Sequence, residues 1–244
     1  MNYNSPTNTL PKPVWDSGDR GLALPVAQER GRHTLERLLD AAEQMLDFVG
    51  LEGATVPAIA VSAGVSVGTV YKRFPDKDAL LRAVYERFFT DLLAANQFAL
   101  DPAKWVDTPT VELVTTIVAG MVDGYRSRKS LIRALLLYAE THTDSEFRAH
   151  AEERRLETFK LFEALLRDRK ADIGHPHPDR AIRFVVALFG HALQDAVVSE
   201  SGGRDLLASG SESSAELAKI VVGYLRVKGT ERPRAMSHTR KPPV

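Results

Sequence analysis

The chain has 244 residues, its 32 lysines and arginines are balanced by 32 aspartates and glutamates, and it contains no cysteine. The absence of cysteine excludes disulfides, thiol nucleophiles and thiolate metal sites. Uninterrupted apolar stretches such as Phe184–Gly190 are far shorter than the roughly 18 residues that cross a bilayer. Zero net charge argues against polyanion binding over the whole surface but permits a local basic patch. The first ten residues carry no signal-peptide pattern, so we expect a cytoplasmic protein.

The N-terminal segment, residues 1 to about 28, is rich in Asn, Thr, Ser, Pro and Gly and shows no apolar periodicity. This composition predicts a disordered arm, in which Trp15 is exposed or loosely docked. From Leu35 to Val49 apolar residues recur at helical spacing. Thr34 is expected to cap the N-terminus of this helix, and Gly50 is expected to follow its C-terminus.

Two short helices follow, and their spacing predicts Thr55–Ala63 and Ser66–Phe74 with Gly64–Val65 between them. Thr55 and Ser66 are the expected N-caps. A glycine in the turn allows the positive φ that a tight connection requires. Two short helices joined in this way form a helix-turn-helix. The second helix is expected to turn these residues outward: Ser66, Val67, Gly68, Thr69, Tyr71, Lys72 and Arg73.

The remainder of the chain also reads as helices, and no run alternates polar and apolar residues as a strand would. Asp76 is expected to cap a long helix, which ends before a break around Pro102 and Pro109. The later helices are expected at Val111–Tyr125, at Leu131–Glu140 with Ser130 as cap, from Asp144 or Ser145 to Leu166, at Ala181–Val198 with Pro178 in its first turn, and at Leu217–Leu225. Loops are expected at Ile173–Asp179 and Ser199–Ser214. The prediction is an all-α protein of about nine helices.

The motif residues resemble a known family. The run Ile59-Ala60-x2-Ala63-Gly64-Val65-Ser66-x-Gly68-Thr69-x-Tyr71-x2-Phe74-x2-Lys77-x2-Leu80 resembles the DNA-binding domain of TetR-type (tetracycline-repressor-like) transcriptional regulators. The upstream helix, with Ala41-Ala42, Phe48 and Gly50, is similar to the first helix of that family. The resemblance implies a DNA-binding domain at 29–76, a ligand-binding and dimerisation domain at 77–228, and a basic disordered tail at 229–244.

Residue roles follow from the same resemblance. Three residues would hold phosphates: Thr55, Thr69 and Lys77. Three would lie at the DNA groove: Ser66, Val67 and Gly68. The others would contact backbone, bases or the minor groove: Tyr71, Lys72, Arg73, Arg30 and Arg32. Pro57 departs from the family pattern, which has a polar or charged residue at that position, and removes one possible phosphate donor.

The resemblance implies a ligand-responsive regulator without cofactor or metal, most consistent with a repressor that binds a palindromic operator in double-stranded DNA. Homodimerisation is expected through Ala181–Val198 and Leu217–Leu225, and a small, largely apolar effector is expected to release the DNA. Most aromatic and methionine positions should be core, while a subset lines an apolar pocket. The residues considered for that pocket are Phe88, Leu92, Met121, Tyr125, Tyr138, Phe159, Phe162, Phe184 and His191.

Two other classes are alternatives: a helical enzyme, and a DNA-architectural protein, each with an incidental helix-turn-helix. The run His175-Pro176-His177-Pro178-Asp179 is the most suggestive ligand cluster, but its spacing matches no zinc signature. The sequence contains no G-x-S-x-G and no phosphate-binding glycine loop, so an enzyme is not expected. The polar residues His191, Gln194 and Asp195 lie in the most apolar helix, where they face either a subunit interface or a pocket.

Overall fold

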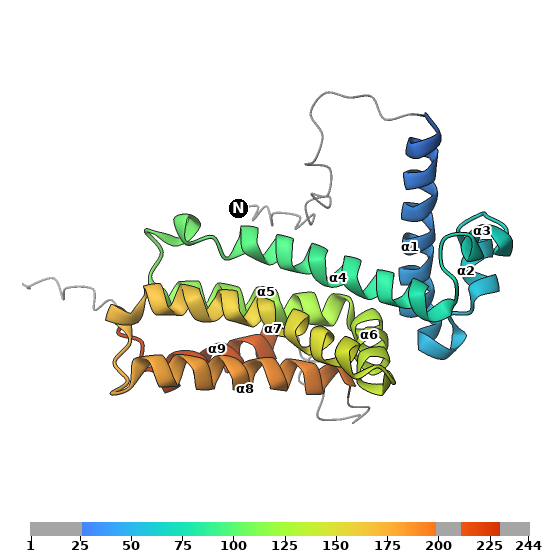
Figure 1. The fold of residues 1–244 in the computed structure, drawn as a ribbon. Helices are drawn as coiled ribbons and strands as arrows, with labels where there is room; N and C mark the ends of the chain where they lie inside the picture. Colours follow the sequence, from blue (N-terminus) through green and yellow to red (C-terminus); the bar gives the residue numbers. More distant parts are fainter. Residues whose placement is uncertain (1–25, 199–210, 230–244) are drawn as a thin grey trace, which may run out of the picture.

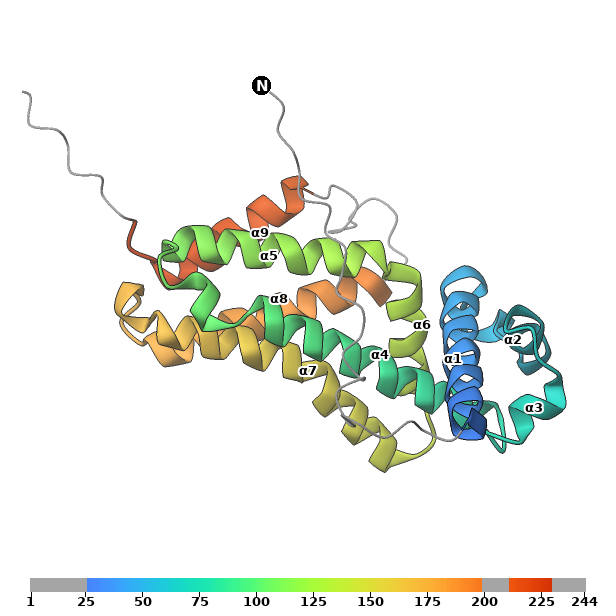
Figure 2. The same cartoon turned by 90° about the horizontal axis from the view of Figure 1, so that it is seen from above.

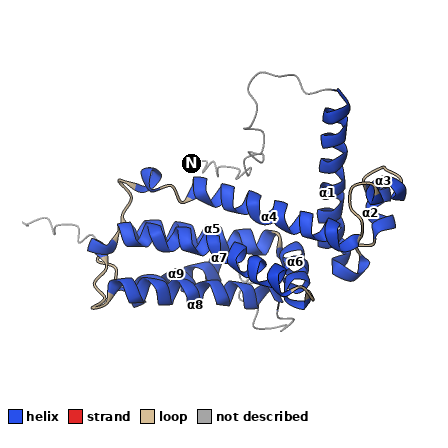
Figure 3. Cartoon of the chain, in the orientation of Figure 1, coloured by secondary structure: helices blue, strands red, loops and turns tan. Residues whose placement is uncertain are grey.

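The computed structural model describes residues 26–198 and 211–229, and these form nine α-helices and two short 3-10 helices (Figures 1 and 3). Within the described residues, an isolated antiparallel bridge between Ile173 and Val227 is the only extended pairing. The predicted all-α class is therefore confirmed. Trp15, most of the predicted arm and tail, and residues 199–210 of the predicted loop lie outside the described residues.

The first helix, α1 (Val26–Gly53), begins well before the predicted start. Thr34 lies inside it and donates its hydroxyl to the carbonyl of Arg30, so the predicted N-cap is wrong. A threonine within a helix bonds back to the preceding turn in this way. Gly50 has φ +71° and kinks the end of the helix, as the expected C-terminal glycine would.

The next helices, α2 (Val56–Ser62), α3 (Val67–Tyr71) and α4 (Lys77–Ala99), begin at the predicted caps. Thr55 accepts from the amide of Ala58 at 3.3 Å, Ser66 from Thr69 at 3.2 Å, and Asp76 from Ala79 at 2.7 Å. Each side chain satisfies an amide that has no partner within its helix. Local sequence therefore defines where all three helices start.

The remaining elements form a bundle: η1 (Pro102–Trp105), α5 (Thr110–Ser127), α6 (Lys129–Thr141), α7 (Ser145–Asp168), η2 (Lys170–Asp172), α8 (Pro178–Val198) and α9 (Ser211–Leu225). Asp144 caps α7 as predicted, by accepting from the amides of Glu146 and Phe147. Ser130 does not cap α6, because the helix begins at Lys129 and Ser130 lies in its first turn. The amide of Leu131 in that turn instead donates to Asp47 of α1 at 3.0 Å. The last helix begins at Ser211, inside the predicted loop, so the predicted start was too late.

The helices α1 to α3 lie at one end of the molecule, and α4 runs from that end along the bundle (Figures 1 and 2). In the bundle, α5 packs against α9, and α7 and α9 pack against α8. The buried apolar residues form one continuous core, which extends from Leu38 of α1 to Leu225 of α9. Movement of α4 or α1 therefore cannot occur without repacking at the junction between the two halves.

The helix α8 is long and apolar enough to cross a membrane by length and composition alone, with 21 residues and a mean hydropathy of 1.5. However, 56% of its most apolar window is buried inside the fold. Residues such as Ile182, Val186 and Leu193 are almost fully enclosed by the neighbouring helices. We therefore interpret α8 as a core helix of the bundle.

Candidate nucleic-acid interface

The outward face of α3 carries most of the residues predicted to contact DNA. Val70 and Phe74 anchor the segment, because their side chains are only 1% and 8% exposed against the small core of α1 and α2. The opposite side is open, with Val67 and Tyr71 exposed at 38% and 50%. Gly68, Lys72 and Arg73 are exposed as well. A short helix is thus presented with small, aromatic and basic side chains facing solvent, a combination that suits the major groove.

The turn between α2 and α3 depends on glycine and on a distant arginine. Gly64 has φ +64°, a backbone conformation that favours glycine. The guanidinium of Arg37, on α1, donates to the carbonyls of Ala63 and Gly64. Sequence reasoning missed Arg37, because it lies 26 residues before the turn and no local pattern joins the two. Arg37 completes the hydrogen bonding at the end of α2 and fixes α1 against the turn.

The hydroxyl groups predicted to meet phosphate already have local roles. Ser66 and Thr69 are joined through their hydroxyl oxygens at 2.9 Å, while Ser66 also caps α3. Thr55 caps α2 and is exposed. Each of these groups is held in one orientation at the start of a helix. A phosphate contact would therefore need little rearrangement, and this role stays a prediction.

Lys77, in the first turn of α4, contacts the end of α1. Its ammonium donates to the carbonyl of Leu51 at 3.0 Å, close to the kink in α1. This contact satisfies a carbonyl at the helix end and joins α1 to α4. Because an ammonium has three donor hydrogens, the predicted phosphate contact remains compatible with this bond.

The arginines predicted before the first helix lie within it. Arg30 and Arg32 are exposed on the first turns of α1, and Arg32 lies 3.7 Å from Glu36 one turn later. The guanidinium of Arg73 lies beside Gly31, where an added Cβ would be 3.5 Å from Nη2. The structure therefore brings the start of α1 next to the end of α3. Exposed Arg73, just after α3, thus lies beside the segment of α1 that carries Arg30 and Arg32, and this edge is basic on a chain with no net charge.

An ion-pair cluster joins α1 to the bundle. Glu43 of α1 accepts from Arg87 of α4 at 2.6 Å and from Arg128, which precedes α6, at 2.8 Å. Arg87 also bonds Asp40 of α1 at 2.7 Å. The side chains of Glu43 and Arg87 are only 16% and 14% exposed. Together with the Asp47 bond to α6, the cluster fixes α1 against two helices of the bundle.

A second cluster surrounds Asp78 in the first turn of α4. Its carboxylate accepts from Tyr138 at 2.7 Å, from His142 at 2.8 Å and from Arg82 at 2.8 Å. The other ring nitrogen of His142, Nδ1, accepts a hydrogen bond from the amide of Asp144. The ring proton therefore lies on Nε2, toward Asp78. Burial opposes ionisation of Asp78, but these hydrogen bonds outweigh it and lower its pKa from 3.8 to about 2. The cluster connects α4 to the junction of α6 and α7.

The nine residues predicted for the pocket occupy several different places. Phe88 packs under Arg128 and against Phe89, Tyr138 bonds Asp78, and Phe159 and Phe162 pack on Phe189. Met121 is buried and Leu92 is half-buried, whereas Phe184 and His191 are exposed. Tyr125 bonds Gln194, and burial raises the pKa of this tyrosine to about 12. Gln194 is thus a paired interior group.

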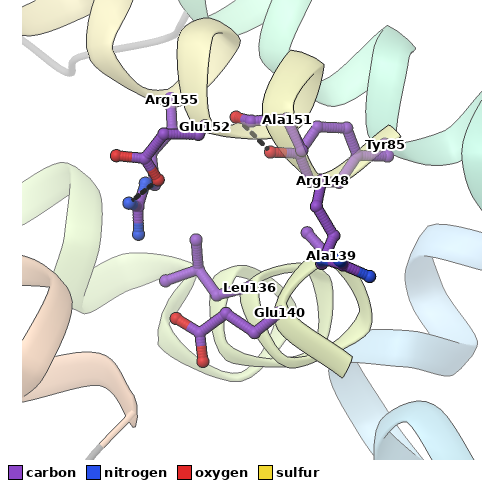
Figure 4. A pocket seen from close by; sticks show the side chains of 8 residues that line it. All are labelled: Tyr85, Leu136, Ala139, Glu140, Arg148, Ala151, Glu152 and Arg155. Carbon is purple, nitrogen blue, oxygen red and sulfur yellow. Dashed lines mark hydrogen bonds and ion pairs between the residues drawn. The ribbon is translucent and has the colours of Figure 1, made fainter. Parts of the chain in front are cut away.

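A cavity of about 260 Å³ lies between α4, α6 and α7, with Tyr85 and Leu136 among the residues that line it (Figure 4). None of the nine predicted pocket residues lines this cavity. The sequence pattern could not locate it, because helical spacing marks which residues face inward but not where packing leaves a space. Ligand contact by the nine residues stays a prediction.

The histidine pair before α8 does not form a metal centre. His177 donates its amide to the ring of His175, and that ring packs on Tyr224 at 5.3 Å. Among the described residues, no group of three or more His, Asp or Glu side chains is arranged to hold a metal ion. The histidines instead shape the loop between η2 and α8.

The chain thus consists of a small helix-turn-helix domain with an open second helix, joined by one long helix to a helical bundle. Residues 38–84 match the family of bacterial regulatory proteins named tetR. The HTH-type transcriptional regulator BetI of Burkholderia thailandensis is 31% identical over 122 residues, which are 49% of this chain and 62% of that relative. The chain thus matches less than two thirds of the length of this relative.

Solved structures extend the likeness over most of the fold. FadR of Bacillus subtilis, in complex with stearoyl-CoA, has a TM-score of 0.59 and 16% identity and covers 78% of this chain and 98% of its own. FadR of Thermus thermophilus, in complex with lauroyl-CoA, has a TM-score of 0.55 and is 21% identical in sequence. The match covers 82% of this chain and 98% of that protein. Residues 38–84 therefore resemble the tetR family in sequence, and the solved structures share the overall fold of the chain. These relatives and fold neighbours are transcriptional regulators and not enzymes.

Proposed function

We propose that the chain is a repressor that binds a palindromic operator as a homodimer and is released from it by a small effector. The open face of α3 is the observation that carries this proposal, since Val67 and Tyr71 are exposed beside Lys72 and Arg73. The complexes of the two FadR proteins with acyl-CoA molecules support an effector site in a bundle of this kind. A location in the cytoplasm belongs to the same proposal, because the operator DNA is there.

The proposed dimer contact is the exposed side of α8 and α9. Phe184 and Leu188 on α8 are 55% and 51% exposed, and Ile220 and Tyr224 on α9 are 54% and 39% exposed. The rings of Phe184 and Tyr224 lie 5.5 Å apart, so the two helices present one apolar patch. A two-fold axis through this patch would bury it and would place two copies of α3 about one turn of DNA apart.

The proposed response to the effector uses the two clusters at the junction. The cavity lies beside the end of α6 and the start of α7, where Tyr138 and His142 hold Asp78 of α4. An effector that displaces α6 or α7 would therefore move the start of α4 and, through Lys77, the end of α1. It would release DNA only if it bound the released conformation better than the DNA-bound one.

The test is retardation of the DNA upstream of the protein's own gene in native gels, with unrelated DNA of equal length as competitor. The wild-type chain should retard its upstream DNA at concentrations where unrelated DNA stays free. Tyr71→Ala should weaken that binding about tenfold or more, as loss of one good contact at a base would. Val106→Ala removes a 69% exposed apolar side chain from the far part of the fold and should leave binding unchanged. Equal retardation of specific and unrelated DNA by the wild type would contradict the proposal.

A further inference from the structure

The cavity between α4, α6 and α7 is lined by apolar and by charged residues. Tyr85, Leu136, Ala139 and Ala151 are the less polar ones, and the hydroxyl of Tyr85 already donates to the carbonyl of Ala151 at 3.0 Å. Glu140, Arg148, Glu152 and Arg155 are the charged ones and lie around the cavity (Figure 4). The cavity thus offers a ring and aliphatic side chains for an apolar body, with charged groups around it for a polar head.

Arg155 is the group in this cavity with an unmet hydrogen bond. Its Nε is buried and has no hydrogen-bond partner among the described residues. Its Nη2 donates to Glu152, whose side chain is 51% exposed, while that of Arg155 is only 15% exposed. Buried donors are normally satisfied, so an orphaned one in a cavity wall calls for an acceptor. A guanidinium edge presents two parallel donors that match the two oxygens of a carboxylate.

The other charges in the cavity are less suited to bind a head group. Arg148 is tied to the carbonyls of His142 and Thr143 at the end of α6. Glu152 already accepts from Arg155, and Glu140 is exposed to solvent. A cationic ligand would gain little from solvated carboxylates, whereas an anionic one would satisfy a donor that the fold leaves without a partner.

The neighbouring residue Arg154 provides an internal comparison. Its Nε is also buried without a hydrogen bond, but it lies 3.5 Å from Glu86. Its other nitrogens donate to Glu157 at 2.6 Å and to Thr90 at 2.5 Å. Arg154 does not line the cavity. The two arginines therefore have the same chemistry and almost the same burial, but only Arg155 lines the cavity.

We propose that this cavity binds an effector with a carboxylate on an apolar body, and that Arg155 receives the carboxylate while Tyr85 and Leu136 contact the body. This inference rests on the proposed function, because it assigns the chemistry of the effector. Glu152 leaves Arg155 when the ligand binds, and its exposed position lets it turn into solvent. The sequence prediction of a largely apolar effector is thereby refined to an organic acid.

The test is isothermal titration of the full chain with straight-chain carboxylates from acetate to dodecanoate, and with the amide and the amine of each length. At least one carboxylate should bind tenfold or more tightly than its matched amide and amine. Arg155→Gln should abolish this preference, and Arg155→Lys should restore only part of it, because lysine lacks the paired donors. Arg154→Gln should keep the preference. Thermal melting of each variant shows whether it is folded.

Three results would overturn the inference: no carboxylate of the series binds at millimolar concentration, an amide or amine binds as tightly as its carboxylate, or folded Arg155→Gln retains the preference. Gel retardation of upstream DNA without any added acid is measured in parallel. If specific retardation fails while the carboxylate preference holds, the proposed repressor function is wrong and the site stands. If retardation holds and the preference fails, the assignment of the effector is wrong and the repressor function stands.

Discussion

Gly64 and Arg37 together hold the turn on which the recognition helix depends. The φ of Gly64 is +64°, a backbone conformation that is strained for any residue with a side chain. A Cβ added at this position would also lie 2.7 Å from Nη2 of Arg37. The arginine donates to the consecutive carbonyls of Ala63 and Gly64 at the start of the turn, so displacing its side chain breaks these hydrogen bonds. The backbone strain and the steric conflict therefore act at the same position.

Gly64→Ala should lower the free energy of unfolding by about 1–2 kcal/mol, because alanine is strained in the left-handed backbone conformation. Displacement of Arg37 by the new Cβ should lower it further. Urea denaturation followed by circular dichroism measures this change. Gly124→Ala is the matched control, because Gly124 lies within α5 and an added Cβ there meets nothing within 4 Å. That control should be neutral or stabilising by up to about 1 kcal/mol. Equal effects at the two positions would show that the turn does not require glycine.

Asp78 links stability to pH through its hydrogen bonds. Its pKa is about 2 in the folded chain against an ordinary value of 3.8, so the folded state favours the ionised carboxylate. A lowered pKa contributes stability that is complete above about pH 4 and is lost as the pH falls toward 2. Because this side chain is 45% exposed, solvent screening reduces the size of the effect.

Asp78→Asn should therefore be less stable than the wild type at pH 6, and the difference should shrink as the pH falls from 4 to 2. Urea midpoints of both proteins across this range provide the measurement. Other carboxylates titrate equally in both chains, so the difference isolates Asp78. A difference that stays constant with pH would mean that Asp78 is not ionised in its cluster.

At the scale of elements, α1 is joined to the bundle by polar contacts as well as by packing. Glu43 pairs with Arg87 and Arg128, and Asp47 accepts from the amide of Leu131 in the first turn of α6. These bonds connect the helix that supports the turn with helices that border the cavity. Rigid helices with specific contacts at their ends are able to transmit a displacement, because packed interfaces do not deform continuously.

Glu43→Gln should destabilise the chain by about 2 kcal/mol, since it weakens charged hydrogen bonds to two arginines that are partly buried. Glu153→Gln, at an exposed position on α7, is the control and should change stability by less than about 0.5 kcal/mol. Denaturant titration at low salt measures the free energy of unfolding of both variants. If Glu43→Gln matches the control, the cluster contributes nothing to the attachment of α1.

For the whole molecule, the proposed DNA binding depends on one small basic edge, because the chain has no net charge. The chain has 32 basic and 32 acidic residues, but Arg73 lies beside the start of α1, which carries further arginines. A dimer through α8 and α9 would present that edge twice. Doubling the contact increases affinity without general attraction to polyanions.

Leu188→Glu should convert a dimer into a monomer, because a carboxylate would lie in the apolar patch twice in a two-fold contact. Light scattering during size-exclusion chromatography gives the mass directly. Val106→Glu adds the same charge at another exposed apolar position and should leave the mass unchanged. A wild-type chain that elutes as a monomer at micromolar concentration would contradict the proposed dimer.

The sequence determined the features that depend on neighbouring residues. Helical spacing, the caps Thr55, Ser66 and Asp76, and the glycine in the turn predicted the helix-turn-helix and the all-α class, because such signals act within a few residues. Tertiary structure decided the contacts between distant residues. Arg37 at the turn, Lys77 on Leu51, Asp47 on α6 and the cavity beside Arg155 arise where separate helices meet. No periodicity along the chain encodes which ends come together or where packing leaves a space.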